Sequence, residues 1–313
     1  MKFNSVYIES GAIKHKRTSE ILQKIDYKKI IEVDHYKDVF CRPRQNYYLQ
    51  HKNQNLILAV KHDNFLYPGA EVCQDFGYNK FYWCSSVMNC ICDCEYCYLK
   101  GMYPSGNLVV YVNLEDYFKN IHDKKYICVS YDTDLFPLES TLGYIEKWCD
   151  FAKSYPDITL EIRTKCKNLS VWKMEAPTNV IFAFSVSPDS IIKMYEHKTS
   201  SLAARIENFE TAQNCGFRTR LCIDPIIYCA DWKEKYSEMM GKIDVSKFED
   251  ISVGSFRISQ QYLKNMRKYS ESKLVNFPFK NVNGYYQYEP ELQASMEEYV
   301  CSLLPRNKVF LWK

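Results

Sequence analysis

Four cysteines lie within eight residues of this chain, and their spacing is the first sign of chemistry. Residues 89–101 read NCICDCEYCYLKG, so Cys90, Cys94 and Cys97 follow the pattern C-x3-C-x2-C, with Cys92 as an extra cysteine inside it. Thiolates are the ligands of structural zinc and of iron–sulfur clusters. The spacing therefore predicts a metal centre or a redox site in this stretch.

Three kinds of site are compatible with these thiols. A zinc site needs four ligands, usually as two separated pairs, and the chain has no second C-x2-C or H-x3-H pair. Cys94 and Cys97 could instead form a redox-active C-x2-C pair. A [4Fe–4S] cluster normally takes four thiolates, and three would leave one iron open to bind and reduce a small molecule.

The composition is that of a folded protein from a reducing compartment. The chain has 313 residues, 46% hydrophobic and 25% charged, and no apolar run approaches the roughly 18 residues of a membrane span. No secretory signal is evident, so we expect a cytoplasmic location, where clustered cysteines indicate metal binding or catalysis. The scattered cysteines are expected to be small buried residues, namely Cys41, Cys149, Cys166, Cys215 and Cys301.

The positive charge is concentrated in the last fifth of the chain. The net charge is +3, yet from Arg257 onward nine basic residues stand against five acidic ones. A basic segment rich in aromatic residues could face a polyanion. On charge alone, a solvated lysine-rich surface is the simpler interpretation.

Short β-branched or aromatic runs alternate with helical patterns, which indicates βαβ units and a parallel sheet. The expected strands span residues 80–87, 107–112, 126–132, 158–164, 180–187, 218–228 and 250–256. Helical patterns span residues 114–122, 142–155, 201–215 and 232–243. Gly216 follows the third of these in the C-cap place.

The number of these units fits a complete or partial (β/α) barrel, and an open doubly wound sheet fits almost as well. In either fold, functional side chains gather at the carboxyl ends of the strands. We therefore expect them in the cysteine stretch and at residues 131–134, 164–165, 185–187 and 224–228.

The two ends of the chain differ from this repeat. Residues 6–25 read as a strand and a helix, and residues 55–62 as another strand, which predicts an N-terminal lobe. The tail, residues 281–305, predicts a hairpin and then a helix. Its Asn283-Gly284 pair is a strong hairpin-turn signal.

Several segments, in order along the chain, resemble one family. The stretches CEYCYLKG and VVYVNLEDYF are similar to the spore photoproduct lyase family of the radical S-adenosylmethionine (SAM) superfamily. Further similar segments are VYIESGAI, LEIRTK, FAFSVSPDSIIKMYEHKTSSLAARIENFETAQNCG, IDPIIY and GYYQYEPEL. The resemblance implies an α/β fold: a partial (β/α)6 barrel of radical SAM type with an N-terminal α/β extension and a C-terminal β-hairpin plus helix. It implies a lobe at 1–75, the barrel at 76–258 and a DNA-contacting segment at 259–313.

The resemblance also implies an activity. The chain would be a radical SAM DNA-repair lyase that reverts 5-thyminyl-5,6-dihydrothymine, the spore photoproduct, to two thymines through a 5′-deoxyadenosyl radical. Cys90, Cys94 and Cys97 would hold a [4Fe–4S] cluster whose open iron binds SAM, with Cys92 as a bystander. Two alternatives stay open: a radical SAM enzyme acting on a peptide or small molecule, and a non-enzymatic iron–sulfur or zinc protein that binds nucleic acid.

The SAM contacts are carried over residue by residue. Most radical SAM enzymes use a Gly-Gly-Glu-type motif, whereas this chain has SYDTD, as the lyase family has its own short motif. Thr133 and Asp134 fall on the family's Ser and Asp positions. Lys165 falls on the lysine that meets the SAM carboxylate, and Ser185 on the next polar contact.

Two loop tyrosines and a cysteine complete the expected catalytic set. Tyr96 and Tyr98 fall on the family's two tyrosines, and Tyr98 would lie near SAM and relay a hydrogen atom. At the position of the family cysteine that returns a hydrogen atom to the thymine radical, this chain has Tyr131. Cys73 precedes the cluster strand in a segment that lies by the lesion pocket in this family. We therefore hypothesise that Cys73 is the donor, with Tyr98 and Tyr131 in the relay.

The tail supplies the expected DNA contacts, which are Lys273, Lys280, Tyr285 and Tyr286, with Tyr288 beside them. The expected partners are double-stranded DNA carrying a thymine dimer-type lesion and an electron donor such as flavodoxin or ferredoxin. We expect no membrane association, a monomer, and a location in the cytoplasm of the spore or germinating cell.

Overall fold

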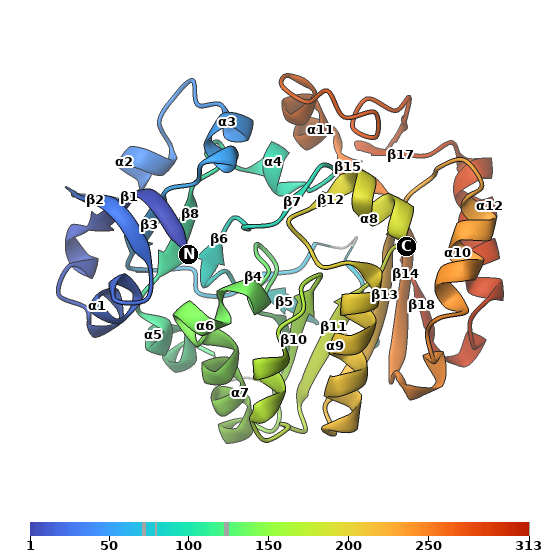
Figure 1. The fold of residues 1–313 in the computed structure, drawn as a ribbon, viewed down its shortest axis with the longest axis horizontal. Coiled ribbons are helices and arrows are strands. Elements are labelled where there is room, and N and C mark those ends of the chain that lie inside the picture. Colours follow the sequence, from blue (N-terminus) through green and yellow to red (C-terminus); the bar gives the residue numbers. More distant parts are fainter. Residues whose placement is uncertain (71–72, 79, 122–124, 313) are drawn as a thin grey trace.

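The chain folds into two large β-sheets, one built mainly from N-terminal strands and one that curls into a partial barrel (Figure 1). This computed structural model describes residues 1–70, 73–78, 80–121 and 125–312. None of the helices in these ranges combines the length and the apolar character that a membrane crossing needs. The shorter helices are α1 (Lys16–Leu22), α2 (Lys37–Phe40), α3 (Tyr47–Lys52), α4 (Leu99–Met102), α5 (Leu114–Lys119), α6 (Glu139–Leu142), α8 (Asp189–Tyr195) and α11 (Gln260–Arg267).

The N-terminal sheet has the strand order β2-β1-β3-β8-β6, and its pairs are parallel except β6 with β8. Its strands are β1 (Lys2–Glu9), β2 (Asp26–Val33), β3 (Leu56–Ala59), β6 (Val87–Met88) and β8 (Leu108–Tyr111). Residues 107–112 were predicted as a barrel strand, and that placement is wrong because β8 pairs with β3. The predicted boundary at residue 75 therefore does not divide the two sheets. Every residue of β8 is buried, as suits a central parallel strand of either sheet.

The second sheet confirms the predicted partial (β/α)6 barrel. Within the described residues, six strands run parallel in the order β5-β9-β10-β11-β13-β14. Antiparallel β4 adds to one edge and parallel β18 to the other. The strands are β4 (Tyr67–Pro68), β5 (Phe81–Trp83), β9 (Tyr126–Cys128), β10 (Thr159–Thr164), β11 (Val180–Ser185), β13 (Arg218–Ile226), β14 (Asp250–Ser255) and β18 (Val309–Leu311).

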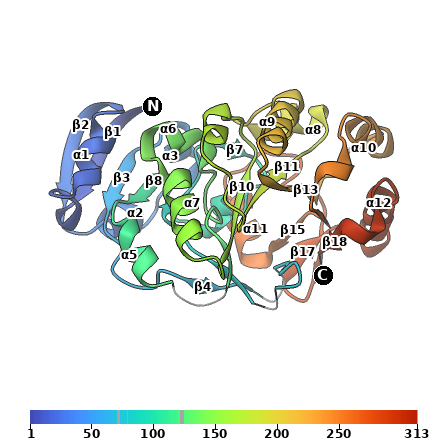
Figure 2. The same cartoon turned by 90° about the horizontal axis from the view of Figure 1, so that it is seen from below.

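Helices cover the outer face of this curved sheet, as Figure 2 shows. Helix α7 (Tyr144–Ser154) packs on β10, α9 (Leu202–Asn214) on β13, and α12 (Pro290–Ser302) on β14, with α10 (Trp232–Met240) beside α12. Helix α9 has the predicted ends. Ser201 accepts the backbone N–H of Ala204 at 3.3 Å, and Gly216 follows with φ at 82°.

A small third sheet lies beside the barrel and contains the predicted hairpin. Strands β16 (Lys280–Val282) and β17 (Tyr285–Gln287) pair antiparallel, and β15 (Arg257–Ser259) pairs with β17. Asn283 and Gly284 both have positive φ, 51° and 85°, which is the backbone that a two-residue I′ turn requires. The predicted helix follows as α12.

A charged cluster, rather than an apolar plug, fills part of the barrel interior. The Arg220 guanidinium is wholly buried and binds Asp250, with Nη2 to Oδ2 at 2.8 Å, and Glu161, with Nη1 to Oε2 at 2.5 Å. The Tyr126 hydroxyl donates to the same Glu161 carboxylate. The ring of Phe76 lies 3.3 Å from the guanidinium carbon. The buried Arg220 cation thus joins four strands, β9, β10, β13 and β14.

Replacing Arg220 by methionine tests this interpretation. The change leaves Asp250 without its cation and Glu161 paired only with Arg163, so we expect the free energy of unfolding to fall by about 3–5 kcal/mol. The matched control is Arg218→Met on the same strand, whose pair with Glu249 is partly exposed and should contribute at most about 1 kcal/mol. Urea denaturation followed by circular dichroism measures both. Equal losses in the two variants would contradict the role of the buried cluster.

Candidate active site

One cavity of about 630 Å³ opens at the carboxyl ends of the barrel strands. Most of the predicted site residues line it together, which sequence alone could only suggest. They are Cys73, Cys90, Cys94, Cys97, Tyr96, Tyr98, Tyr131, Thr133, Asp134, Lys165, Ser185 and Tyr285. The wall also contains Asp224, from the expected range 224–228, and residues that the sequence did not single out, among them Trp83, Arg163, Arg257 and Trp312.

The cysteine loop starts at Asn89, which has a left-handed backbone and a side chain that makes three hydrogen bonds. Asn89 has φ at 68° and is wholly buried. Its amide nitrogen donates to the carbonyls of Ser105, at 2.8 Å, and Asn107, at 2.7 Å, and its oxygen accepts the hydroxyl of Tyr47 at 3.1 Å. Asparagine tolerates this left-handed backbone better than most residues. The turn into the loop is therefore fixed by buried hydrogen bonds.

Two further contacts hold the loop from the N-terminal side. His51 Nε2 and Gln54 Nε2 both donate to the carbonyl of Cys90, at 2.8 and 3.1 Å. Farther along, the buried Lys100 ammonium pairs with Asp93 at 2.5 Å. Because these groups lie away from bulk water, each contact restrains the loop more strongly than it would on the surface.

The loop also carries a short strand. Strand β7 (Asp93–Cys94) pairs antiparallel with β12 (Glu196–His197), and Glu95 N donates to the carbonyl of Tyr195 at 2.7 Å. The backbone around Cys94 is therefore tied to the segment that follows α8.

The thiols of the loop differ in their electrostatic surroundings. Burial raises the pKa of Cys94 well above its usual range and that of Cys97 to about 11. For Cys90, a hydrogen bond from Cys92 lowers the thiol pKa against the effect of burial. Buried thiolates need a compensating positive charge, and iron or zinc supplies it.

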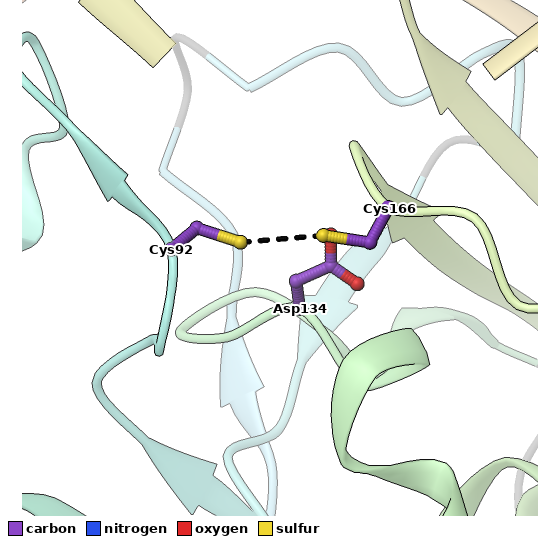
Figure 3. Close-up of side chains that lie close together, drawn as sticks. All are labelled: Cys92, Asp134 and Cys166. Atoms are coloured by element: carbon purple, nitrogen blue, oxygen red, sulfur yellow. Dashed lines mark hydrogen bonds between the residues drawn. The ribbon is translucent and has the colours of Figure 1, made fainter. Parts of the chain in front are cut away.

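Cys92, expected to be a bystander to the cluster, lies against a second thiol. Its Sγ lies 3.4 Å from Sγ of Cys166, with the Asp134 carboxylate beside them (Figure 3). All three ligand atoms lie within 4.8 Å of one another. The carboxylate, however, already accepts hydrogen bonds from the Thr164 hydroxyl at 2.9 Å and from backbone N–H groups. We therefore interpret the trio as a packed hydrogen-bonded contact.

The four expected SAM contacts lie on one side of the cavity. Lys165 N donates to Asp134 at 2.8 Å, and the Lys165 side chain is half-buried at the wall. The hydroxyls of Thr133 and Ser185 are buried and have no hydrogen-bond partner among the described residues. Buried polar atoms without partners are costly, so each of these hydroxyls is suited to a ligand that enters the cavity.

Tyr96 lines the cavity but directs its hydroxyl elsewhere. The hydroxyl donates to the buried carboxylate of Glu196, which pairs with the buried Arg205. The ring packs edge-on against Phe256, with centroids 6.2 Å apart. The contacts of Tyr96 are those of a residue that holds the loop in place.

The proposed hydrogen donor and its neighbours are in contact. Cys73 Sγ lies 3.7 Å from the hydroxyl oxygen of Tyr131. The ring of Tyr131 stacks on Trp83, with centroids 4.8 Å apart. Tyr98 donates its hydroxyl to the backbone carbonyl of Tyr131 at 2.7 Å, and the two rings are 5.9 Å apart. The structure thus joins Cys73 to the Tyr131 hydroxyl, and Tyr98 to the Tyr131 backbone.

The expected DNA-contacting residues are spread more widely. Tyr285 reaches the cavity, whereas Lys273 lies on an exposed turn and Lys280 pairs with Glu289 at 3.2 Å. Tyr286 lies beneath the Arg267 guanidinium. Tyr288 is wholly buried and cannot present its ring to a duplex, so that expectation was wrong.

Two of the residues that sequence reasoning missed, Arg257 and Trp312, lie near the last strand. Strand β18 pairs with β14, and the Leu311 carbonyl accepts Gln74 Nε2 at 2.9 Å. Trp312, directly after β18, donates its indole N–H to Ser252 at 2.8 Å and lies beneath the Arg257 guanidinium. The aromatic run VFLW was the available signal, although it is shorter than most strands.

Comparisons with known proteins agree with this geometry. A family model described as "Spore photoproduct lyase" matches residues 2–274. A spore photoproduct lyase of Clostridium acetobutylicum is 28% identical over 168 residues, 50% of this chain and 49% of that protein. The spore photoproduct lyase of Bacillus subtilis is 22% identical across 97% of this chain and 96% of that protein.

Solved structures share the fold from end to end. A spore photoproduct lyase variant superimposes with a TM-score of 0.79 at 18% identity, covering 99% of this chain and 98% of the other. Another variant, solved with bound AdoMet and the dinucleoside spore photoproduct, gives a TM-score of 0.77 at 19% identity over the same shares.

Asp132, between Tyr131 and Thr133, gives a testable dependence on pH. Burial raises its pKa, and hydrogen bonds from Ser85 and Tyr103 only partly offset this. A carboxyl whose folded pKa exceeds its unfolded pKa destabilises the fold increasingly as pH rises through the folded value. The Asp132→Asn variant should therefore gain stability relative to the wild type as pH rises from about 4, the usual pKa of an aspartate, through the raised folded pKa.

Urea denaturation across that range measures the difference. Asp116→Asn is the control, because a hydrogen bond from Asn113 lowers the pKa of Asp116, so the difference between this variant and the wild type should stay constant above about pH 4. A difference between Asp132→Asn and wild type that stays constant with pH would contradict the assignment.

Proposed function

The chain belongs to the spore photoproduct lyase family, and we propose that it is a radical SAM DNA-repair lyase that reverts the 5-thyminyl-5,6-dihydrothymine spore photoproduct to two thymines. The observation that carries the proposal is one cavity, at the carboxyl ends of the barrel strands, lined by three loop thiols, two unpartnered hydroxyls and a separate cysteine. The three loop thiols and Cys73 line the same cavity.

The residues present fit a [4Fe–4S] cluster together with SAM. Cys90, Cys94 and Cys97 would each bind a different iron, so their sulfurs need not converge on one point as the ligands of a single zinc ion must. The Thr133 and Ser185 hydroxyls and the Lys165 ammonium would receive SAM, and Asp134, which accepts the backbone N–H of Lys165, would hold that residue beside it. When bound, the cluster and SAM supply a 5′-deoxyadenosyl radical, which is the cofactor's own chemistry.

The protein's part is to exclude water and to handle hydrogen atoms. The lesion and two adjacent thymines are isomers, so the hydrogen removed from the dihydrothymine ring must be balanced by one returned to the other base. Cys73 is the proposed source, since its thiol lies against Tyr131 at the cavity wall. The carbon–carbon bond between the bases would break, and the resulting thymine radical would take the hydrogen atom of Cys73. The Cys73 thiyl would then regain a hydrogen atom through Tyr131 and Tyr98, and its source would be the 5′-deoxyadenosine that holds the hydrogen removed from the lesion.

The substrate would be double-stranded DNA with the lesion turned out of the stack. A lesioned pair stacks and pairs poorly, so extrusion costs less than for normal bases. The proposed contact surface lies in the C-terminal segment. It consists of Tyr285 at the cavity together with Lys273, Lys280 and Tyr286. A flavodoxin or ferredoxin would supply electrons, and the protein would act as a monomer in the cytoplasm of the spore or germinating cell.

Cysteine replacements test the cluster and the activity together. After anaerobic reconstitution, reduction and addition of SAM, the wild type should convert a synthetic dinucleotide lesion to thymine pairs. Alanine at Cys90, Cys94 or Cys97 removes an iron ligand and should abolish both the absorbance near about 400 nm and repair. Cys92→Ala, the matched control in the same loop, should retain both. A Cys92 variant as inactive as the others would contradict the ligand assignment.

The donor assignment has its own test in Cys73→Ala. Without a thiol to quench the thymine radical, lesion consumption should continue while the yield of clean thymine pairs falls by about tenfold or more, in favour of side products. Cys41→Ala, which changes an exposed cysteine outside the cavity lining, is the control. Liquid chromatography with mass spectrometry resolves the products. Clean thymine pairs from Cys73→Ala at wild-type yield would rule the donor out.

A further inference from the structure

The geometry points to a buried triad, Tyr96–Glu196–Arg205, as the device that positions the cluster loop over the SAM site. We propose that Tyr96 acts on the reaction through Glu196 and Arg205, as a positioning residue, and does not itself carry a hydrogen atom. The inference rests on the proposed function for its meaning, but its physical basis is a set of buried contacts.

The first part of the triad joins the loop to Glu196. The Tyr96 hydroxyl, between Cys94 and Cys97 in the sequence, donates to Oε1 of Glu196, and the Ser187 hydroxyl donates to the same oxygen at 2.9 Å. Glu196 is 2% exposed and Tyr96 is 7% exposed. A buried carboxylate that accepts two hydroxyls loses much of its stabilisation if either is removed.

The second part joins Glu196 to the floor of the SAM site. Arg205 pairs with Glu196 Oε2 and donates from Nη1 to the carbonyl of Ser185 at 3.0 Å. Its remaining donors reach the Ser200 carbonyl at 2.9 Å and the Thr199 hydroxyl at 2.8 Å. The Arg205 guanidinium therefore fixes two groups. One is Ser185, whose hydroxyl has no partner among the described residues, and the other is the Glu196 carboxylate, which holds the loop.

The backbone reinforces the same connection. Glu196 is paired with Cys94 in the β7–β12 ladder, so the side chain of Glu196 holds Tyr96 while its main chain holds Cys94. Two contacts that act on residues two apart fix the orientation of the loop as well as its distance. Outer contacts of this kind set the geometry of metal ligands.

The chain contains a second Tyr–Glu–Arg triad that serves as an internal control. Tyr126 donates to Glu161, which binds Arg220, and all three are buried. This triad joins barrel strands β9, β10 and β13 and has no member in the cluster loop. Replacing either tyrosine by phenylalanine removes a hydroxyl that donates to a buried, arginine-paired glutamate, and the Tyr126 hydroxyl in addition accepts from Arg220.

The experiment compares Tyr96→Phe, Glu196→Gln and Tyr126→Phe with the wild type in two measurements. The first is the rate at which a chelator removes iron from the reconstituted protein. We expect Tyr96→Phe and Glu196→Gln to lose iron about 10- to 100-fold faster, and Tyr126→Phe to match the wild type. The double variant of Tyr96 and Glu196 should be no worse than Glu196→Gln alone, because both changes break one connection.

The second measurement is amide hydrogen exchange of the loop, residues 89–98, in protein without iron. Exchange should be about tenfold or more faster in Tyr96→Phe than in Tyr126→Phe. If the wild type assembles no cluster, the proposed function fails, but the exchange rates still decide the positioning role. A Tyr96→Phe protein that keeps its iron and its exchange protection but loses repair would overturn the inference, as would equal effects in the two tyrosine variants.

Discussion

The structure depends on how firmly the cysteine loop is held at the mouth of the barrel. The loop is ten residues long, and side chains such as Ile91, Tyr96 and Tyr98 pack in or against the hydrophobic core, but apolar packing alone has little directionality. Its order comes from buried polar contacts: the amide of Asn89, the donors of His51 and Gln54 on the Cys90 carbonyl, and the Tyr96–Glu196–Arg205 triad. Each contact stabilises the loop because it is shielded from water. On an exposed surface, water would compete for the same donors and acceptors.

The barrel supports this loop with a second set of buried charges. Arg220, Glu161 and Asp250 occupy the interior, so the barrel strands are joined by ionic contacts as well as by their ladder. The same side chains take up space that would otherwise admit water below the cavity. Cys73, which lies against Tyr131, and the loop thiols line the same cavity, so the proposed hydrogen donor and the proposed cluster ligands share one space. That arrangement suits radical chemistry, because a radical survives only where water and stray C–H bonds are excluded.

Local sequence patterns predicted the barrel strands, helix α9 with its Ser201 and Gly216 ends, and the Asn283-Gly284 hairpin. They did not place β8, because a run such as LVVY fits a buried parallel strand in either sheet, and only its distant partner β3 decides. The short β18 escaped notice for a similar reason: its stability comes from pairing with β14 and from the Gln74 contact.

The site shows the same limit. Cysteine spacing and family resemblance singled out residues that line one cavity, but they did not identify the side chains that hydrogen-bond to those residues. Nothing near Tyr96 in the sequence points to Glu196, and nothing near Cys92 points to Cys166, since these contacts arise only when segments far apart are packed together. Tyr288 is the opposite case. Its place in a tyrosine-rich hairpin suggested that its ring is exposed, whereas the side chain is wholly buried.

The origin of the hydrogen atom in the product tests the central claim most directly. A thiol exchanges its hydrogen with solvent, whereas carbon-bound hydrogens do not. In a single turnover in deuterium oxide, the account predicts that the repaired thymine pair carries one deuterium, as read by mass spectrometry. A repaired pair without deuterium would mean that the hydrogen returns from carbon, and would contradict the role assigned to Cys73 and to the cavity built around it.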